Sequence, residues 1–157
     1  MHAEIGPHGL HPNEYLRKCG VLYRPELPVS YHFSIVSKAR KWKTNSKTWK
    51  KNWNLCLACE YDRLIGYSNM HLETWQEICR QVGIEGTFSS INKCKKAFAG
   101  IHVNIIDVLD CWSTNDVPRR FGNAHELAKY TKTTNRTLSR HIVKKDKILK
   151  ILMRQIF

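Results

Sequence analysis

Residues 123–157 read NAHELAKYTKTTNRTLSRHIVKKDKILKILMRQIF and show the clearest helical periodicity in the chain. Asn123 is of a type that caps helix N-termini, and Glu126 follows three positions later, so the pair predicts a capping box and a helix that starts at the next residue. The hydroxyl and amide side chains of residues 131–135 then favour a turn or a helix junction. From Thr137 onward a second helix is predicted, because apolar residues recur at three- and four-residue spacing, at Leu138, Ile142, Leu149, Leu152 and Ile156.

The second of these helices is predicted to be basic on its outer faces. Its cations are Arg136, Arg140, Lys144, Lys145, Lys147, Lys150 and Arg154, opposed by Asp146 alone. Two short helices joined by a brief turn, with the second one basic, form the layout of a helix-turn-helix, whose second helix enters the DNA major groove. The alternative, which we favour, is a pair of packed helices in an ordinary bundle with a solvated basic face.

The whole chain is also basic. Its 157 residues carry 26 Lys and Arg against 13 Asp and Glu, which gives a formal net charge of +13. Such an excess favours polyanionic partners, such as nucleic acid or an acidic membrane surface, and predicts salt-dependent binding. The length suits one domain, and a hydrophobic content of 42% with five Trp is typical of a globular chain.

A second basic run lies in residues 38–51, KARKWKTNSKTWKK, which hold seven cations and no acid. Trp42 and Trp49 interleave with these cations, and basic side chains alternating with aromatic rings are typical of surfaces that bind single-stranded nucleic acid. However, Trp49, Trp53, Leu57 and Tyr61 recur every four residues, which predicts core positions on a helix over residues 47–65. We therefore favour the core for Trp49 and Trp53, while Trp42 stays open between core and stacking.

The remaining segments predict further helices around one core. A helix is predicted over residues 29–42, and another carries a stripe of Leu72, Trp75, Ile78, Cys79 and Val82, with Ser68 or Asn69 as its cap. A third follows a cap at Ser89 or Ser90, and residues 101–112 are apolar nearly all round, which predicts the central buried helix. Residues 1–14, rich in His, Gly and Pro, predict a flexible leader before one helical domain over residues 15–157.

No segment carries a strong catalytic or metal-binding motif. Cys56 and Cys59 form a Cys-x-x-Cys pair, but they lie in an apolar helical stripe, so we interpret them and the other four Cys as reduced core thiols. Asp107 and Asp110 are interpreted as the polar edge of a buried helix that pairs with Lys or Arg from the basic helices. We therefore predict no enzyme, cofactor or metal, and no membrane span, since no apolar run approaches about 20 residues. The expected location is intracellular, either nuclear or cytoplasmic.

Two resemblances add to these predictions. Glu126-Leu-Ala128 together with Thr137-Leu-Ser-Arg140 resembles the E-L-A and T-V-S-R segments of bacterial helix-turn-helix regulators, although Lys132 stands where that pattern has Gly. More broadly, the chain resembles a group of small uncharacterised helical proteins of filamentous fungi, over about residues 23–156. The matching motifs include Trp75 with Cys79, Ser90-Ile-x-x-Cys94-Lys95 and Leu127-x-x-Tyr130-Thr131. This second resemblance implies an all-helical domain of fungal origin and no known activity.

We therefore predict an all-α protein, a single compact domain of five to seven helices. The predicted function is non-enzymatic binding of DNA or RNA, mainly through phosphates. The residues predicted to make these contacts are Lys41, Lys43, Lys47, Lys50, Lys51, Arg136, Arg140, Lys144 and Lys147. The alternative is a protein-interaction module whose basic faces keep it soluble or dock an acidic protein partner.

Overall fold

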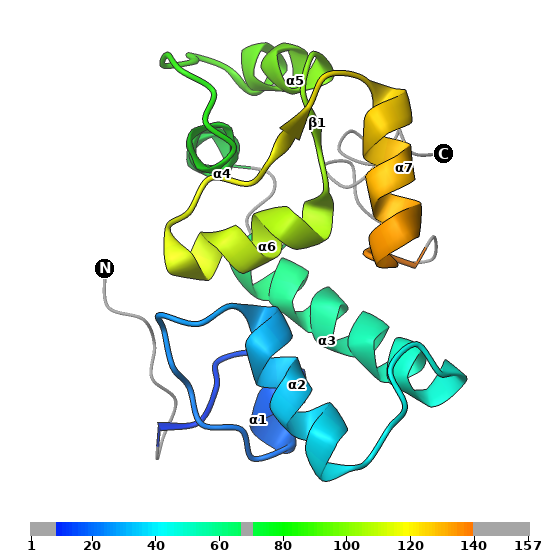
Figure 1. The fold of residues 1–157 in the computed structure, drawn as a ribbon. Coiled ribbons are helices and arrows are strands. Elements are labelled where there is room, and N and C mark those ends of the chain that lie inside the picture. Colours follow the sequence, from blue (N-terminus) through cyan, green and yellow to red (C-terminus); the bar gives the residue numbers. More distant parts are fainter. Residues whose placement is uncertain (1–8, 67–70, 140–157) are drawn as a thin grey trace.

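The computed structural model describes residues 9–66 and 71–139, which form a mostly helical protein (Figure 1). The helices are α1 (Glu14–Lys18), α2 (Val29–Ala39), α3 (Lys47–Leu64), α4 (Leu72–Gln81), α5 (Ile91–Ala99), α6 (Ile105–Thr114) and α7 (Ala124–Thr134). Two short strands, β1 (His102–Val103) and β2 (Arg120–Phe121), pair antiparallel with His102 opposite Phe121. The predicted all-α fold is confirmed. No helix in the described ranges is long and apolar enough to cross a membrane.

Helices α3 and α6 lie against each other in the middle of the molecule and connect its two sides (Figure 1). On one side α3 packs against α1 and α2, while on the other α6 contacts α4, which packs on α5. α7 lies against the two strands. One cluster of buried hydrophobic side chains runs through both sides and includes residues of α1 to α6 and of β1.

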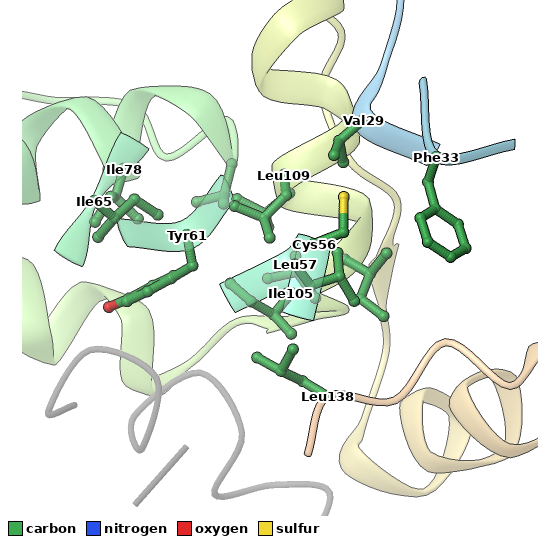
Figure 2. Packing of buried hydrophobic residues seen from close by; sticks show 14 of the residues in the cluster. Val29, Phe33, Cys56, Leu57, Tyr61, Ile65, Ile78, Ile105, Leu109 and Leu138 are labelled. Carbon is green, nitrogen blue, oxygen red and sulfur yellow. The ribbon is translucent and has the colours of Figure 1, made fainter. Parts of the chain in front are cut away.

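The α3–α6 contact forms the centre of this core. Figure 2 shows Leu57 of α3 beside Ile105 and Leu109 of α6, with Leu138 near Ile105. The first three side chains are fully buried and Leu138 is 2% exposed. Complete burial of a side chain of this size contributes about 1.5–3 kcal/mol. The four-residue spacing in α3 therefore predicted its buried face correctly.

The predicted caps at Ser90 and Asn123 are confirmed, and Ser90 caps α5 by accepting from the Lys93 amide at 3.2 Å. Ser46, which was not predicted as a cap, caps α3 by accepting from the Trp49 amide at 3.3 Å. Asn123 caps α7 by accepting from the Glu126 amide at 2.9 Å. The Glu126 carboxylate bonds the Gly122 amide at 3.0 Å, one residue earlier than a standard capping box. For α4 the N-cap is His71, and the predicted caps Ser68 and Asn69 lie outside the described residues.

The predicted helix over residues 101–112 is wrong at its beginning. His102 and Val103 form β1, and α6 begins only after Asn104. The Asn104 carboxamide oxygen caps α6 by accepting from the Ile106 and Asp107 amides at 2.9 and 3.2 Å. Its NH₂ group donates to the Thr131 hydroxyl and to the Arg136 carbonyl, so this buried side chain also ties α6 to the end of α7. An Asn within an apolar run was the signal for this boundary.

Residues 9–14 belong to the folded body, contrary to the predicted leader. The Tyr23 amide donates to the Gly9 carbonyl at 2.8 Å, and the His11 amide donates to the Val21 carbonyl at 2.9 Å. His11 is 1% exposed, and Asn13 is fully buried where its side chain donates to the Cys56 carbonyl at 3.0 Å. Composition suggested a leader because His, Gly and Pro have no periodicity, whereas these residues are held by pairing with a later segment.

Candidate nucleic-acid interface

The basic run of residues 38–51 covers the end of α2, the connecting turn and the first turns of α3 (Figure 1). The predicted helix over residues 29–42 instead ends at Ala39. Lys41 has a left-handed backbone with φ 56°, its amide donates to the Lys38 carbonyl at 3.1 Å, and the Trp42 amide donates to the Ser37 carbonyl at 3.0 Å. These two bonds form a Schellman motif, which ends a helix and usually brings an apolar residue back onto it. Trp42 is that residue, with its ring centroid 6.3 Å from that of Phe33.

Exposed lysines gather on the end of α2, on this turn and on the start of α3. We call them the lysine surface, and they are Lys38, Lys41, Lys43, Lys47, Lys50 and Lys51. Within residues 9–66 and 71–139, none of them forms an ion pair. The segment that carries these lysines also supplies no acid to pair with them, since the sequence contains no Asp or Glu between Glu26 and Glu60.

The start of α3 adds to the positive potential of the lysine surface. Lys47, Lys50 and Lys51 lie in its first two turns, where no acid is present, and their spacing of three and four places them close together. The N-terminal end of a helix carries about half a positive charge, so lysines there oppose the helix dipole and anions are favoured. This arrangement suits an anionic ligand and costs the free protein some stability.

Arg136 was also predicted to contact phosphates, but its environment differs from that of the exposed lysines. Its Nε donates to Asp107 Oδ1 and its Nη2 to Asp110 Oδ2, both at 2.6 Å, and its side chain is 24% exposed. Burial lowers the pKa of the guanidinium, but the bonds to the two carboxylates outweigh it and raise this pKa above its usual value. The predicted pairing of the two aspartates with a basic residue is thereby confirmed. Arg136 is engaged inside the protein and is not available as a free phosphate contact.

The other predicted contacts, Arg140, Lys144 and Lys147, lie outside the described residues, as does most of the predicted second C-terminal helix. The first helix of the proposed helix-turn-helix is α7, which continues through Lys132 to Thr134. The chain turns only at Asn135, which has a left-handed backbone with φ 55°. In this last turn the Thr133 hydroxyl donates to the Lys129 carbonyl and the Thr134 hydroxyl donates to the Tyr130 carbonyl, both at 2.7 Å.

The three tryptophans of this region differ in exposure. Trp53 is 6% exposed and belongs to the core, which confirms its prediction. Trp49 and Trp42 are half-buried and pack at the edge of the core. The rings of Trp49 and Trp53 lie 5.5 and 4.9 Å from that of Phe33, and the Arg40 guanidinium stacks 5.6 Å from the Trp42 ring centre. Trp42 and Trp49 thus border the lysine surface with part of each ring accessible.

A pocket of about 260 Å³ lies beside these rings, between α2, the start of α3 and the end of α7. Its lining includes Lys38, Trp42, Trp49, Ser34, Thr44 and Asn135. Sequence analysis found the lysines and tryptophans of residues 38–51 but missed Ser34 and Asn135, which lie outside that run. Asn135 is remote in sequence from the basic run, so no local pattern links the two.

The six cysteines all lie in the described part of the chain. All six cysteines are free, and no group of three metal-ligating side chains occurs among the described residues. Burial raises the pKa of Cys79 to about 12 and of Cys111 to about 11, and raises that of Cys56 well above its usual value. These thiols therefore stay protonated and unreactive near neutral pH, as predicted for core cysteines.

Comparisons with protein-family models, with curated proteins and with solved structures found no match to this chain. The resemblances to fungal helical proteins and to helix-turn-helix regulators therefore stay predictions.

Proposed function

We propose that this protein binds nucleic acid without catalysis, contacting phosphates through the lysine surface. The observation that carries the proposal is a group of six exposed lysines on the end of α2, the following turn and the start of α3, with no acidic residue between Glu26 and Glu60 to neutralise them. The placement of three of them at the positive end of α3 supports it further, because that placement is unfavourable for the free helix and favourable for a bound anion.

Fluorescence anisotropy against short duplex DNA, single-stranded DNA and RNA tests this proposal. The measurements run from low to near-physiological salt, with heparin as a competitor. We expect micromolar binding that weakens linearly on a plot of log affinity against log salt. The opposite result is binding that heparin abolishes equally for every nucleic-acid form and that vanishes at physiological salt. It would mean that the lysines attract any polyanion and do not recognise nucleic acid.

A matched pair of variants locates the contact. Lys47→Gln/Lys50→Gln removes two charges from the lysine surface, and Lys93→Gln/Lys96→Gln removes two exposed lysines of equal spacing from α5. Each phosphate contact on a single strand contributes about 0.7 to the salt slope, so the first variant should flatten the slope by about 1.4. The α5 variant should leave it nearly unchanged. An equal loss in both variants would contradict the assignment to the lysine surface.

A protein-interaction role is the second candidate, and a specific surface favours it. Leu22, Tyr31 and Ile35 are 64%, 40% and 43% exposed, and they line a pocket of about 330 Å³ to which Arg24 and Arg40 also contribute. Exposed apolar side chains beside arginines suit a partner helix with apolar and acidic residues. A labelled amphipathic acidic peptide should bind the wild type and lose affinity for Ile35→Glu. The lysine-surface variant should bind the same peptide normally if the two surfaces act separately.

A further inference from the structure

The pocket beside the lysine surface has the size of a single ring system. Its volume is about 260 Å³, below the roughly 300–1,000 Å³ of sites that enclose drug-sized ligands. A smaller hollow of about 80 Å³ shares Trp49, Trp53 and Asn135 with it and adds Lys50 to the lining. The two hollows therefore lie next to each other, and lysines line both, Lys38 in the larger and Lys50 in the smaller.

The pocket lining combines two kinds of chemistry. Four lining residues are aromatic: Trp42 and Trp49 are half-buried, and Phe33 and Trp53 are buried with their ring centroids 4.9 Å apart. Ring faces of this kind stack on any nucleobase. Elsewhere the lining is polar, with the side chains of Thr44 and Asn135 exposed to solvent. Hydroxyl and amide groups supply the donors and acceptors that base edges require.

Charge decides between an aromatic base and a neutral aromatic side chain as the occupant. Lys38 lines the pocket itself, Lys43 directly precedes the lining residue Thr44, and Lys50 lines the adjoining hollow. A base of a nucleic-acid strand is followed by phosphates on both sides, and these phosphates can contact the lysines. An aromatic side chain of a protein partner carries no negative charge that would pair with them.

We propose that this pocket receives one unpaired base of a single-stranded nucleic acid, while the flanking phosphates contact the lysine surface. This inference rests on the proposed function and adds to it a preference for single strands, because a base in a duplex is already stacked and paired. The ion pairs of Arg136 help to form the pocket, since they hold the residue that follows Asn135 against α6.

The test compares two oligonucleotides of the same length and charge, one of thymidines and one with an abasic site at every position. Stacking of one base on an aromatic side chain corresponds to a roughly tenfold or larger gain in affinity. We therefore expect the wild type to bind the thymidine strand at least about tenfold more tightly than the abasic strand. This comparison needs no variant, so it does not depend on the folding of a mutant.

A pair of α2 variants then assigns the gain to the pocket. Ser34→Leu adds bulk inside the pocket and removes only a local bond from the Ser34 hydroxyl to the Tyr31 carbonyl. Ala39→Leu adds bulk to the same helix at the pocket of the second candidate surface. Ser34→Leu should reduce the tenfold ratio to near one and leave abasic binding unchanged, whereas Ala39→Leu should change neither value.

The outcomes separate the two proposals. Equal affinity of the wild type for both strands, or a ratio that Ser34→Leu leaves unchanged, would overturn the base pocket and leave the lysine surface standing. Failure to bind either strand would overturn both. Loss of abasic binding in Lys47→Gln/Lys50→Gln would support the lysine surface alone.

Discussion

Lys47 and Arg136 belong to the two basic segments of the chain, yet their surroundings differ. Lys47 is exposed at the start of α3 and has no ion-pair partner among the described residues. Arg136 lies between Asp107 and Asp110 at 2.6 Å from each. A positive charge therefore stabilises the fold at Arg136 and destabilises it at the start of α3. For this reason the number of cations in a segment does not identify a binding surface.

Replacing Arg136 should have the largest effect on stability. Arg136→Ala leaves two partly buried carboxylates without their partner, and breaking such a pair costs about 3 kcal/mol. Arg136→Lys keeps the charge but cannot bond both carboxylates in the same way, so an intermediate loss is expected. Urea unfolding of both variants measures this. If Arg136→Ala lowers the unfolding free energy by less than about 0.5 kcal/mol, the ion pairs of Arg136 do not stabilise the fold, and Arg136 does not differ from the exposed lysines in this respect.

Mild acid should lower the unfolding free energy through His11 and His32, which lie outside both basic segments. Burial, followed by the nearby His32 and Arg63, lowers the pKa of His11 to about 3, whereas an unfolded histidine titrates near 6.5. His11 is thus neutral when folded, and its contribution is complete above pH 6.5 and lost as the pH falls toward 3. Between pH 7.5 and 5 the loss is about 2 kcal/mol for this residue.

The pH dependence of the unfolding free energy checks this prediction. His32 should add to the slope, because burial lowers its pKa as well. His11→Asn keeps an acceptor for the Asn13 amide, which His11 Nδ1 bonds at 2.9 Å, but cannot titrate. Its slope should be shallower than that of the wild type. An identical slope would show that other groups cause the acid sensitivity.

The strained position of Lys41 should yield a smaller, stabilising effect. Its left-handed backbone is costly for a residue with a side chain and natural for glycine. Lys41→Gly should therefore raise the unfolding free energy by about 1 kcal/mol, while it removes one charge from the lysine surface and weakens nucleic-acid binding slightly. A loss of stability would mean that the lysine side chain contributes more than its backbone strain costs.

The smallest expected change concerns the lysines at the start of α3. Lys47→Gln/Lys50→Gln removes charges that oppose the helix dipole and should stabilise the protein by about 0.5 kcal/mol while it weakens binding. The α5 control, Lys93→Gln/Lys96→Gln, includes a lysine in the last helical turn, where a cation is favourable. It should show no gain in thermal or urea unfolding. Equal stability changes in both would contradict a cost specific to the lysine surface.

The sequence predicted helix starts and buried faces correctly where the residues of one segment determine them. The Trp49 to Tyr61 spacing predicted the buried face of α3, and Ser90 and Asn123 predicted the starts of α5 and α7. It failed where residues distant in sequence decide, as at Gly9 and His11, which pair with the segment before α2.

The same limit applies to the candidate site. The lysines and tryptophans of residues 38–51 were visible because they are contiguous. The sequence also predicted that Asp107 and Asp110 pair with a basic residue, but that this residue is Arg136, and that Asn135 lines the pocket, required the fold. The end of α2 was misplaced because nothing in a lysine side chain indicates the left-handed backbone that Lys41 adopts.

The double role of Asp110 has a consequence for the order in which the chain folds. The N-cap of α2 is Pro28, which has no capping side chain, and Asp110 supplies the cap instead by accepting from the Ser30 amide at 3.0 Å and the Ser30 hydroxyl at 2.9 Å. These groups are 80 residues apart in sequence. During synthesis α2 therefore emerges long before its cap, and its first turn is completed only when α6 has formed. Although α2 is one of the first helices to be made, it reaches its final stability only after α6.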